Sequence, residues 1–258
     1  MRALNSDLKY YLDLLSVLTQ KEIKVRYKSS FFGYIWSVAY PLAFCLVFFV
    51  AFKMVMKVPM ENYTIFLLSG LFPWQWFSNS VLMSVNSFLA NASLIKKVNF
   101  PRLVIPLVTV LNDMVHFIFS IPVLTLFLIY YGIYPSISWI YGIPLFCLSQ
   151  FLLTSGIALT VSSVNLFFRD LERLVAIATT LLFYMTPIIY SEGMIPERFK
   201  AYLPFNPLAL LIIGWRDLFL KGSLNLSYLI SSILIGSFFF LFGYSIYRKL
   251  NYRFAEVL

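Results

Sequence analysis

The residues best suited to acid–base chemistry lie inside a long apolar run. Asp113 and His116 are three positions apart, with Asn112 beside them, so a helix would place the pair on one face. Such a pair inside a membrane would suit proton transfer or metal binding. It would equally suit hydrogen bonds between helices. The chain has one histidine and no second cluster of cysteines or carboxylates, so we favour the structural role and expect no metal site.

Nucleotide chemistry is missing from the sequence. It contains no G-x-x-x-x-G-K-[ST] phosphate-binding loop, so this polypeptide cannot hydrolyse ATP by that route, and an ATP-driven step would need another chain. Two short basic loops, at 91–102 and 165–173, would suit contact with such a chain. Either could instead be an ordinary cytoplasmic loop that retains positive charge.

The elements that must position these residues are membrane helices. The 258 residues are 60% hydrophobic and 12% charged, with a mean hydropathy of +0.83, whereas a soluble domain carries about 25% charged residues. The net charge of +9 does not indicate nucleic-acid binding, because the basic residues flank apolar runs and form no single patch. A span needs roughly 20 apolar residues. We therefore predict six spans, at 31–52, 63–89, 103–131, 137–165, 174–190 and 226–247.

The charge distribution gives this arrangement an orientation. Fourteen of the 20 Lys and Arg residues lie on one side of the six spans and six on the other, which predicts that both termini are cytoplasmic. Residues 1–28 have apolar positions at three- and four-residue spacing, typical of a helix lying along the membrane surface. Residues 191–222 combine three prolines with an apolar run too short to span, which predicts a re-entrant helical hairpin before the last span. The expected fold class is an all-α integral membrane domain.

The segment R-Y-K-S-S-F-F-G-Y-I-W at 26–36 resembles a signature of ABC-2 type permeases that export polysaccharides. The resemblance continues, in order, through 69–74, 96–102, 186–190 and 206–208, and so extends over nearly the whole chain. By these motifs the chain is similar above all to the membrane subunits of O-antigen and teichoic acid exporters. The resemblance implies a single transmembrane domain over 1–258 and a transporter subunit of the bacterial inner membrane that is not an enzyme.

The resemblance also implies partners and site residues. The permease would form a homodimer with two copies of a cytoplasmic ABC ATPase, which would hold ATP and Mg²⁺, while this chain would carry no cofactor. The cargo would be a polysaccharide linked to polyprenyl pyrophosphate. The first and fifth spans would line its channel with Trp36, Tyr40, Phe44, Tyr184, Thr186, Pro187 and Tyr190. The ATPase would couple to Leu94, Lys96, Lys97, Phe100, Arg102, Arg169 and Arg173. The hairpin at 191–222 would form the outer gate, with Pro196, Pro204, Asn206, Pro207 and Arg216.

Physical arguments support two of these roles. Trp36, Tyr40 and Phe44 are spaced by four, so they share a helix stripe, and aromatic faces stack on sugar rings with the weak binding that conduction requires. These rings could instead face lipid or pack against helices. Arg26 and Lys28 precede the first span, where they would meet a pyrophosphate headgroup or, alternatively, anionic phospholipids.

The sequence is also compatible with other functions. An ABC-2 exporter could instead carry teichoic acid, capsule, or a small drug or lipid. In a different class, the chain could be an intramembrane enzyme that acts on lipid-linked sugars, with Asp113 and His116 as acid and base.

Overall fold

The computed structural model describes residues 2–27, 35–55, 57 and 62–254, and this part of the chain forms helices and connecting loops without a strand. Three of its helices are long and apolar enough to cross a bilayer, namely α6 (Val104–Tyr130), α7 (Ser138–Asn165) and α11 (Leu226–Leu250). The all-α membrane fold predicted from composition is therefore confirmed.

Three further helices occupy the remaining predicted spans and are shorter or more polar. Helix α2 (Ile35–Phe48) continues as the π-helix η1 (Phe49–Val55), α3 covers Tyr63–Val85, and α8 covers Leu171–Met185. Helix α3 ends before the predicted 89, because the chain turns at Asn86 before the short α4 (Ser87–Ala90).

Helix α8 is shifted relative to the predicted span 174–190. It begins three residues earlier and ends at Met185, because Thr186 has an extended backbone and Pro187 has no N–H to donate.

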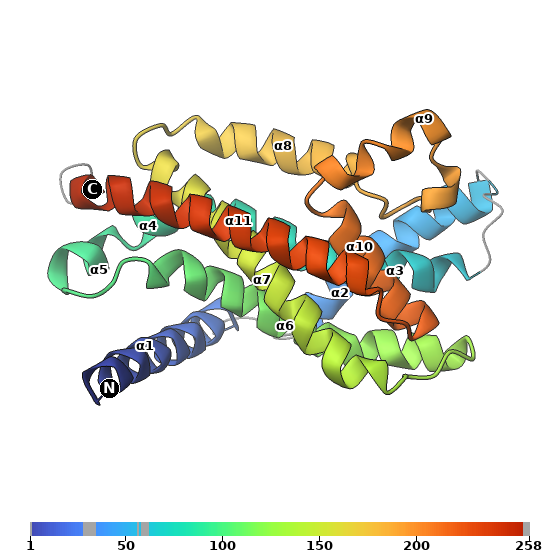
Figure 1. The fold of residues 1–258 in the computed structure, drawn as a ribbon, viewed down its shortest axis with the longest axis horizontal. Helices are drawn as coiled ribbons and strands as arrows, with labels where there is room; N and C mark the ends of the chain where they lie inside the picture. The colour runs from blue at the N-terminus through green and yellow to red at the C-terminus, as the bar shows by residue number, and fades with distance from the viewer. Residues whose placement is uncertain (1, 28–34, 56, 58–61, 255–258) are drawn as a thin grey trace.

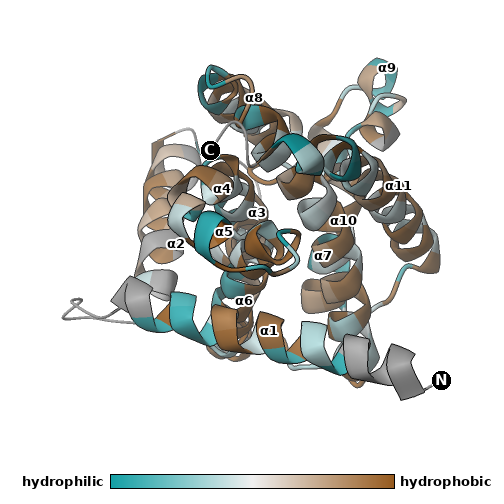
Figure 2. Ribbon diagram, turned by 90° about the vertical axis from the view of Figure 1, so that its left-hand side faces the viewer, coloured by the Kyte–Doolittle hydropathy of each residue, from teal (hydrophilic) through white to brown (hydrophobic). Residues whose placement is uncertain are grey.

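The helices alternate in direction between two ends of the molecule (Figure 1). The α3–α6 connection, which includes α4 and α5 (Ala92–Lys97), lies at the left-hand end with the α7–α8 loop and the end of α11. The α6–α7 turn and the segment between α8 and α11 lie at the right-hand end. Figure 2 views the molecule from the left-hand end, where α5 carries hydrophilic residues while brown, hydrophobic residues predominate in the helices behind it.

Helix α1 (Arg2–Tyr27) crosses this end and packs on α6. Thr19 is buried there, and Leu15 and Leu18 are half-buried. Leu12 and Val17 remain exposed, so α1 has apolar surface beyond its contact with the bundle. This arrangement suits a helix that also contacts lipid.

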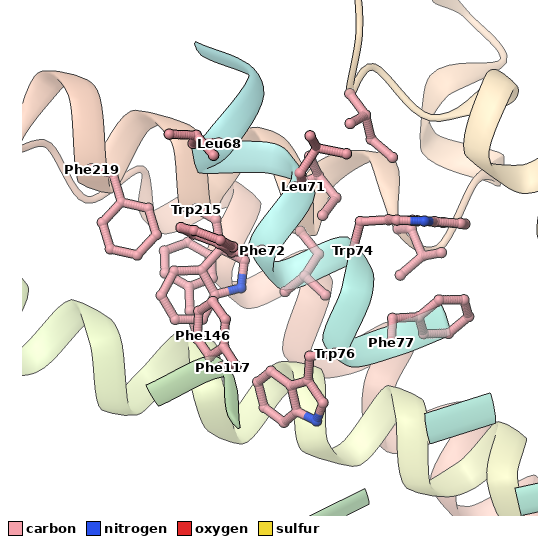
Figure 3. Packing of buried hydrophobic residues seen from close by; sticks show 14 of the residues in the cluster. Leu68, Leu71, Phe72, Trp74, Trp76, Phe77, Phe117, Phe146, Trp215 and Phe219 are labelled. Carbon is pink, nitrogen blue, oxygen red and sulfur yellow. The ribbon is translucent and has the colours of Figure 1, made fainter. Parts of the chain in front are cut away.

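The segment 191–225 returns part of the chain into the bundle. It contains η2 (Glu192–Met194), α9 (Glu197–Lys200), η3 (Leu203–Phe205), α10 (Ala209–Arg216) and the π-helix η4 (Asp217–Lys221). The α10 residue Trp215 is fully buried, with ring centroids 5.0 Å from Phe117, 5.4 Å from Phe146 and 5.2 Å from Phe219 (Figure 3). Helix α10 is thus covered by protein from α6, α7 and η4.

A buried amide links three helices near this aromatic core. The side chain of Gln150 on α7 donates to the carbonyl of Pro73 on α3 over 2.7 Å, and accepts from the indole N–H of Trp215 over 2.7 Å. Gln150 is fully buried, so these bonds satisfy an amide that water does not reach. They hold α10 at a defined depth between α3 and α7.

Candidate functional site

A cavity of about 360 Å³ lies between α2, α3 and α8, and it combines aromatic rings with amides and hydroxyls. Its lining residues are Phe44, Phe48, Leu71, Trp74, Gln75, Ser78, Asn79, Leu82, Ala176, Thr179, Thr180, Phe183 and Tyr184. The cavity brings together the helices that the sequence analysis assigned to the first and fifth spans.

One wall of the cavity is an aromatic cluster. The Phe183 ring contacts Phe48, at a centroid distance of 5.6 Å, and Trp74, at 5.4 Å. Each of these rings comes from a different helix, so the cluster joins α2, α3 and α8. Phe44 and Tyr184 are 40% and 58% exposed, so their rings are accessible to a molecule in the cavity. Accessible aromatic faces of this kind can stack on the apolar face of a ring-shaped ligand.

Polar side chains from α3 and α8 also line the cavity. Gln75 and Asn79 are one turn apart on α3, and Asn79 is exposed. On α8, the hydroxyl of Thr180 donates to the Ala176 carbonyl over 2.9 Å, which leaves its oxygen able to accept. An exposed amide is costly against lipid, so this surface suits a water-containing path or another protein chain. The cavity can therefore both stack on a ligand and hydrogen-bond to it.

The end of α8 is fixed by a buried arginine. The two terminal nitrogens of Arg216 donate to the carbonyls of Pro187, over 2.8 Å, and Ile188, over 3.1 Å. The guanidinium also lies 3.7 Å from the centroid of the Phe66 ring. Arg216 is only 7% exposed, so its charge is stabilised by these carbonyls and by the ring. Arg216, on α10, thus connects the residues that follow α8 to α10 and, through Phe66, to α3.

Two other side chains hold the same segment. The hydroxyl of Tyr63 donates to the Ile189 carbonyl over 2.9 Å. The Asn206 amide donates to the hydroxyl of Thr186 over 3.0 Å, and its oxygen accepts from the Leu208 N–H over 3.0 Å. The irregular backbone at 186–190 thus has specific partners, as buried non-helical backbone requires. We call residues 186–190 with Arg216, Tyr63 and Asn206 the α8 joint.

The structure separates the predicted channel residues into groups. Phe44 and Tyr184 line the cavity, whereas Thr186 and Pro187 are buried in the α8 joint. Tyr190 is half-buried, and its hydroxyl donates to the Tyr184 carbonyl over 3.2 Å. Trp36 is 54% exposed and is not among the lining residues, while the side chain of Tyr40 lies outside the described part of the chain.

Several lining residues escaped the sequence analysis. The residues not named there as site residues include Trp74, Gln75, Asn79, Thr180 and Phe183. Gln75, Ser78 and Asn79 follow a three- and four-residue spacing within an otherwise apolar run. That polar stripe on a membrane helix was the signal that could have identified α3 as a wall of the site.

The predicted acid–base residues lie elsewhere. Asp113 and Asn112 are buried, and the hydroxyl of Ser80 on α3 donates to the Asp113 carboxylate over 3.0 Å. Nearby, the indole of Trp76 donates to the Val110 carbonyl over 3.2 Å. Asp113 therefore links α3 to α6 and does not line the cavity.

Of the predicted gate residues, Asn206 and Arg216 belong to the α8 joint. Pro196 is exposed and Pro207 is half-buried, while the side chain of Pro204 lies outside the described residues. The side chain of Arg26 and the whole of Lys28 also lie outside them, so the headgroup prediction remains a prediction.

Basic side chains gather at the end of the molecule that carries α5. Lys96 and Lys97 are exposed in the last turn of α5, and Arg169 and Arg173 are exposed around the start of α8. Leu94 and Phe100 are half-buried beside them. Arg102 differs, because it donates to the carbonyl of Asn251 over 3.0 Å. The two predicted coupling loops therefore lie at the same end of the molecule, and Arg102 ties the first to the end of α11 (Figure 1).

A separate apolar cluster supports this basic end. It includes Phe88, Ile95, Leu166, Tyr247 and Phe254. The Phe254 ring is fully buried, with centroid distances of 4.8 Å to Phe88 and 6.0 Å to Tyr247. The residues after α11 thus hold α4 and α5 in place.

We expect Phe254→Ala to loosen the loop that carries α5. Removing a buried Phe costs about 3–5 kcal/mol in a well-packed core, and this small cluster has few other contacts to compensate. Hydrogen–deuterium exchange of the purified chain should therefore speed up at 88–102, with little change at 105–128. Tyr252→Ala is a matched control, because Tyr252 is 67% exposed. Equal exchange rates at 88–102 in both variants would contradict the role of Phe254 in holding α4 and α5.

Comparison with known proteins identifies the family of this chain. Residues 13–220 match the ABC-2 type transporter family. The O-antigen export system permease protein RfbA of Klebsiella pneumoniae is 51% identical over 252 residues, which cover 98% of this chain and 97% of the relative. The protein of that name from Myxococcus xanthus is 31% identical over 221 residues, 84% of each chain. The polysialic acid transport protein KpsM of Escherichia coli is 26% identical over 244 residues, 91% of this chain and 92% of the relative. This chain belongs to the ABC-2 type transporter family.

Proposed function

We propose that this chain is the membrane-spanning permease subunit of an ATP-driven exporter of an O-antigen type polysaccharide across the bacterial inner membrane. The observation that carries the proposal is the cavity between α2, α3 and α8, whose lining combines accessible aromatic rings with amides and hydroxyls. A hydrated sugar chain offers both apolar ring faces and hydroxyls, so such a wall can bind each unit weakly and release it. Relatives named for O-antigen export and polysialic acid transport support this cargo class.

In the proposed topology, α2, α3, α6, α7, α8 and α11 each cross the membrane. The exposed basic residues of α5 and of the α7–α8 loop then mark the cytoplasmic side, as the positive-inside rule requires. Both termini are cytoplasmic in this arrangement. The segment 191–222 enters from the outer side, and α10 is tolerated at depth because protein covers it.

The proposed assembly is a homodimer with two cytoplasmic ATPase subunits. Leu174, Ile177 and Leu181 form an exposed stripe on α8, more than 50% exposed at each position, next to the cavity. A second copy on this side would close the cavity into a passage. The basic end with α5 and the α7–α8 loop would receive the ATPase. The pyrophosphate of a polyprenyl-linked cargo would meet Arg26 and Lys28.

The test uses the purified permease with and without its partner ATPase. We expect no ATP hydrolysis by the permease alone, because it lacks a phosphate-binding loop, and hydrolysis that is stimulated by lipid-linked polysaccharide in proteoliposomes containing both proteins. In cells, deletion of the permease should trap lipid-linked polysaccharide inside. Robust hydrolysis by the isolated chain would reject the assignment, and trapping of a small lipid or drug in its place would reject the polysaccharide cargo.

A further inference from the structure

The walls of the cavity between α2, α3 and α8 carry no charged side chain. None of the lining residues is an Asp, Glu, Lys, Arg or His. The sequence extends this observation beyond the lining, because 35–52, 63–85 and 174–190 contain none of these five residue types. The absence of charge is therefore a property of all three helices and does not depend on which of their side chains face the cavity. A second copy of the chain would add the same uncharged wall.

The threonine hydroxyls in the cavity offer acceptors to a ligand. Thr179 and Thr180 each donate to the carbonyl four residues earlier on α8, over 2.8 Å and 2.9 Å. A hydroxyl has a single hydrogen to donate, so these two have only oxygen lone pairs left. Lone pairs accept from the hydroxyls of a sugar and repel carboxylate or phosphate oxygens. The amides of Gln75 and Asn79 can donate, but they provide no charge to balance an anion.

The exposed basic residues lie at the end of the molecule that carries α5. Lys96, Lys97, Arg169 and Arg173 are exposed there, and none of them lines the cavity. An anionic sugar unit attracted to these cations would next enter a cavity without a counter-charge, where nothing offsets its loss of water. Pores that conduct anions place Arg or Lys along the path. The pyrophosphate of the cargo crosses once per chain, whereas a charge in the repeating unit would meet this barrier at every step.

We propose that the cavity selects a polysaccharide whose repeating unit carries no net charge. This inference rests on the proposed function and deepens it, because it names the chemical class of the cargo. A neutral glycan donates its hydroxyls to the acceptors of the cavity and leaves no buried charge unpaired. A polyuronate, or a polymer joined by phosphodiesters such as teichoic acid, is excluded by the same physical argument.

The first test examines the native cargo and needs no variant. Lipid-linked polysaccharide that accumulates in the permease-deletion strain is extracted, mild acid cleaves the sugar from the pyrophosphate, and the freed glycan is applied to an anion-exchange column at neutral pH. We expect elution that does not change with chain length, because the repeating unit adds no charge. Retention that increases with chain length would overturn the inference. Failure of the proposed function is distinguishable, because no lipid-linked polysaccharide would then accumulate.

The second test places a charge in the cavity at Asn79, which is exposed on α3. Asn79→Lys is compared with Asn79→Met, which has a similar length and no charge. The initial transport rate of the extracted lipid-linked polysaccharide is measured in proteoliposomes that contain permease and partner ATPase, and it is divided by the amount of permease reconstituted. We expect the Lys variant to transport no faster than the Met variant, because an ammonium retains water that each neutral sugar must displace.

An anionic cargo would give the opposite order. Lysine would then act as a counter-ion in the cavity and raise the rate about tenfold or more over methionine. This advantage would shrink with added salt, because salt screens the attraction. Faster transport by Asn79→Lys than by Asn79→Met would therefore overturn the selection of a neutral glycan.

Discussion

Replacing Arg216 by methionine should abolish export and strongly destabilise the permease. Methionine keeps an apolar stem of similar length but leaves the carbonyls of Pro187 and Ile188 without their donors. Each orphaned buried carbonyl costs about 1–3 kcal/mol. The contact with the Phe66 ring is lost as well. We expect the unfolding midpoint of the purified protein, titrated with SDS in mixed micelles, to fall well below that of the wild type.

Arg216→Lys separates charge from geometry. Lysine keeps the positive charge, but its single ammonium cannot bridge two carbonyls while stacking flat on a ring. We therefore expect only partial recovery of stability and export. Arg248→Met is the matched control for a lost arginine, because Arg248 is exposed in the last turn of α11. Wild-type stability of Arg216→Met would show that the α8 joint does not depend on this residue.

The α8 joint illustrates what sequence reasoning could and could not supply. The motif at 186–190 and Arg216 were both singled out, but as parts of a channel wall and a gate. Their contact joins residues 28 positions apart in the sequence, and the direction in which a buried guanidinium points is decided by tertiary packing. The long apolar helices α6, α7 and α11 were easier to predict, because hydrophobic length is a local property.

The cavity shows a second limit of the same kind. Phe44 and Tyr184 were predicted from a helix stripe and a family motif, and the structure brings both to one cavity. The α3 residues Gln75 and Asn79 were missed because their amides are uncharged and lie within an otherwise apolar run. The three helices that are long and apolar enough to cross a bilayer, α6, α7 and α11, do not line this cavity, whereas α2, α3 and α8 do. Hydrophobic length alone therefore does not identify the helices that form the site.

The second large effect is expected from Gly243→Ala in α11. A Cβ at Gly243 would collide with the backbone carbonyl of Gly156 on α7, and a Cβ at Gly156 would collide with the backbone of Phe239. Neither clash can be relieved by a rotamer change, because both involve main-chain atoms. Such small residues let membrane helices approach closely, and the main attraction between them is this packing. We expect the free energy of unfolding to fall by about 3 kcal/mol, which is the upper end of the usual cost of overpacking.

The measurement is again SDS unfolding, combined with export in cells. Gly193→Ala is the control, because a Cβ there meets only the Ser191 hydroxyl, at 3.8 Å. Displacement of α11 should also reach the basic end, since Tyr247 and Phe254 pack on Phe88 of α4. ATPase stimulation should therefore fall together with stability in Gly243→Ala, while Gly193→Ala retains both. A stable Gly243→Ala protein with normal stimulation would mean that α7 and α11 can separate without disturbing the loops proposed to contact the ATPase.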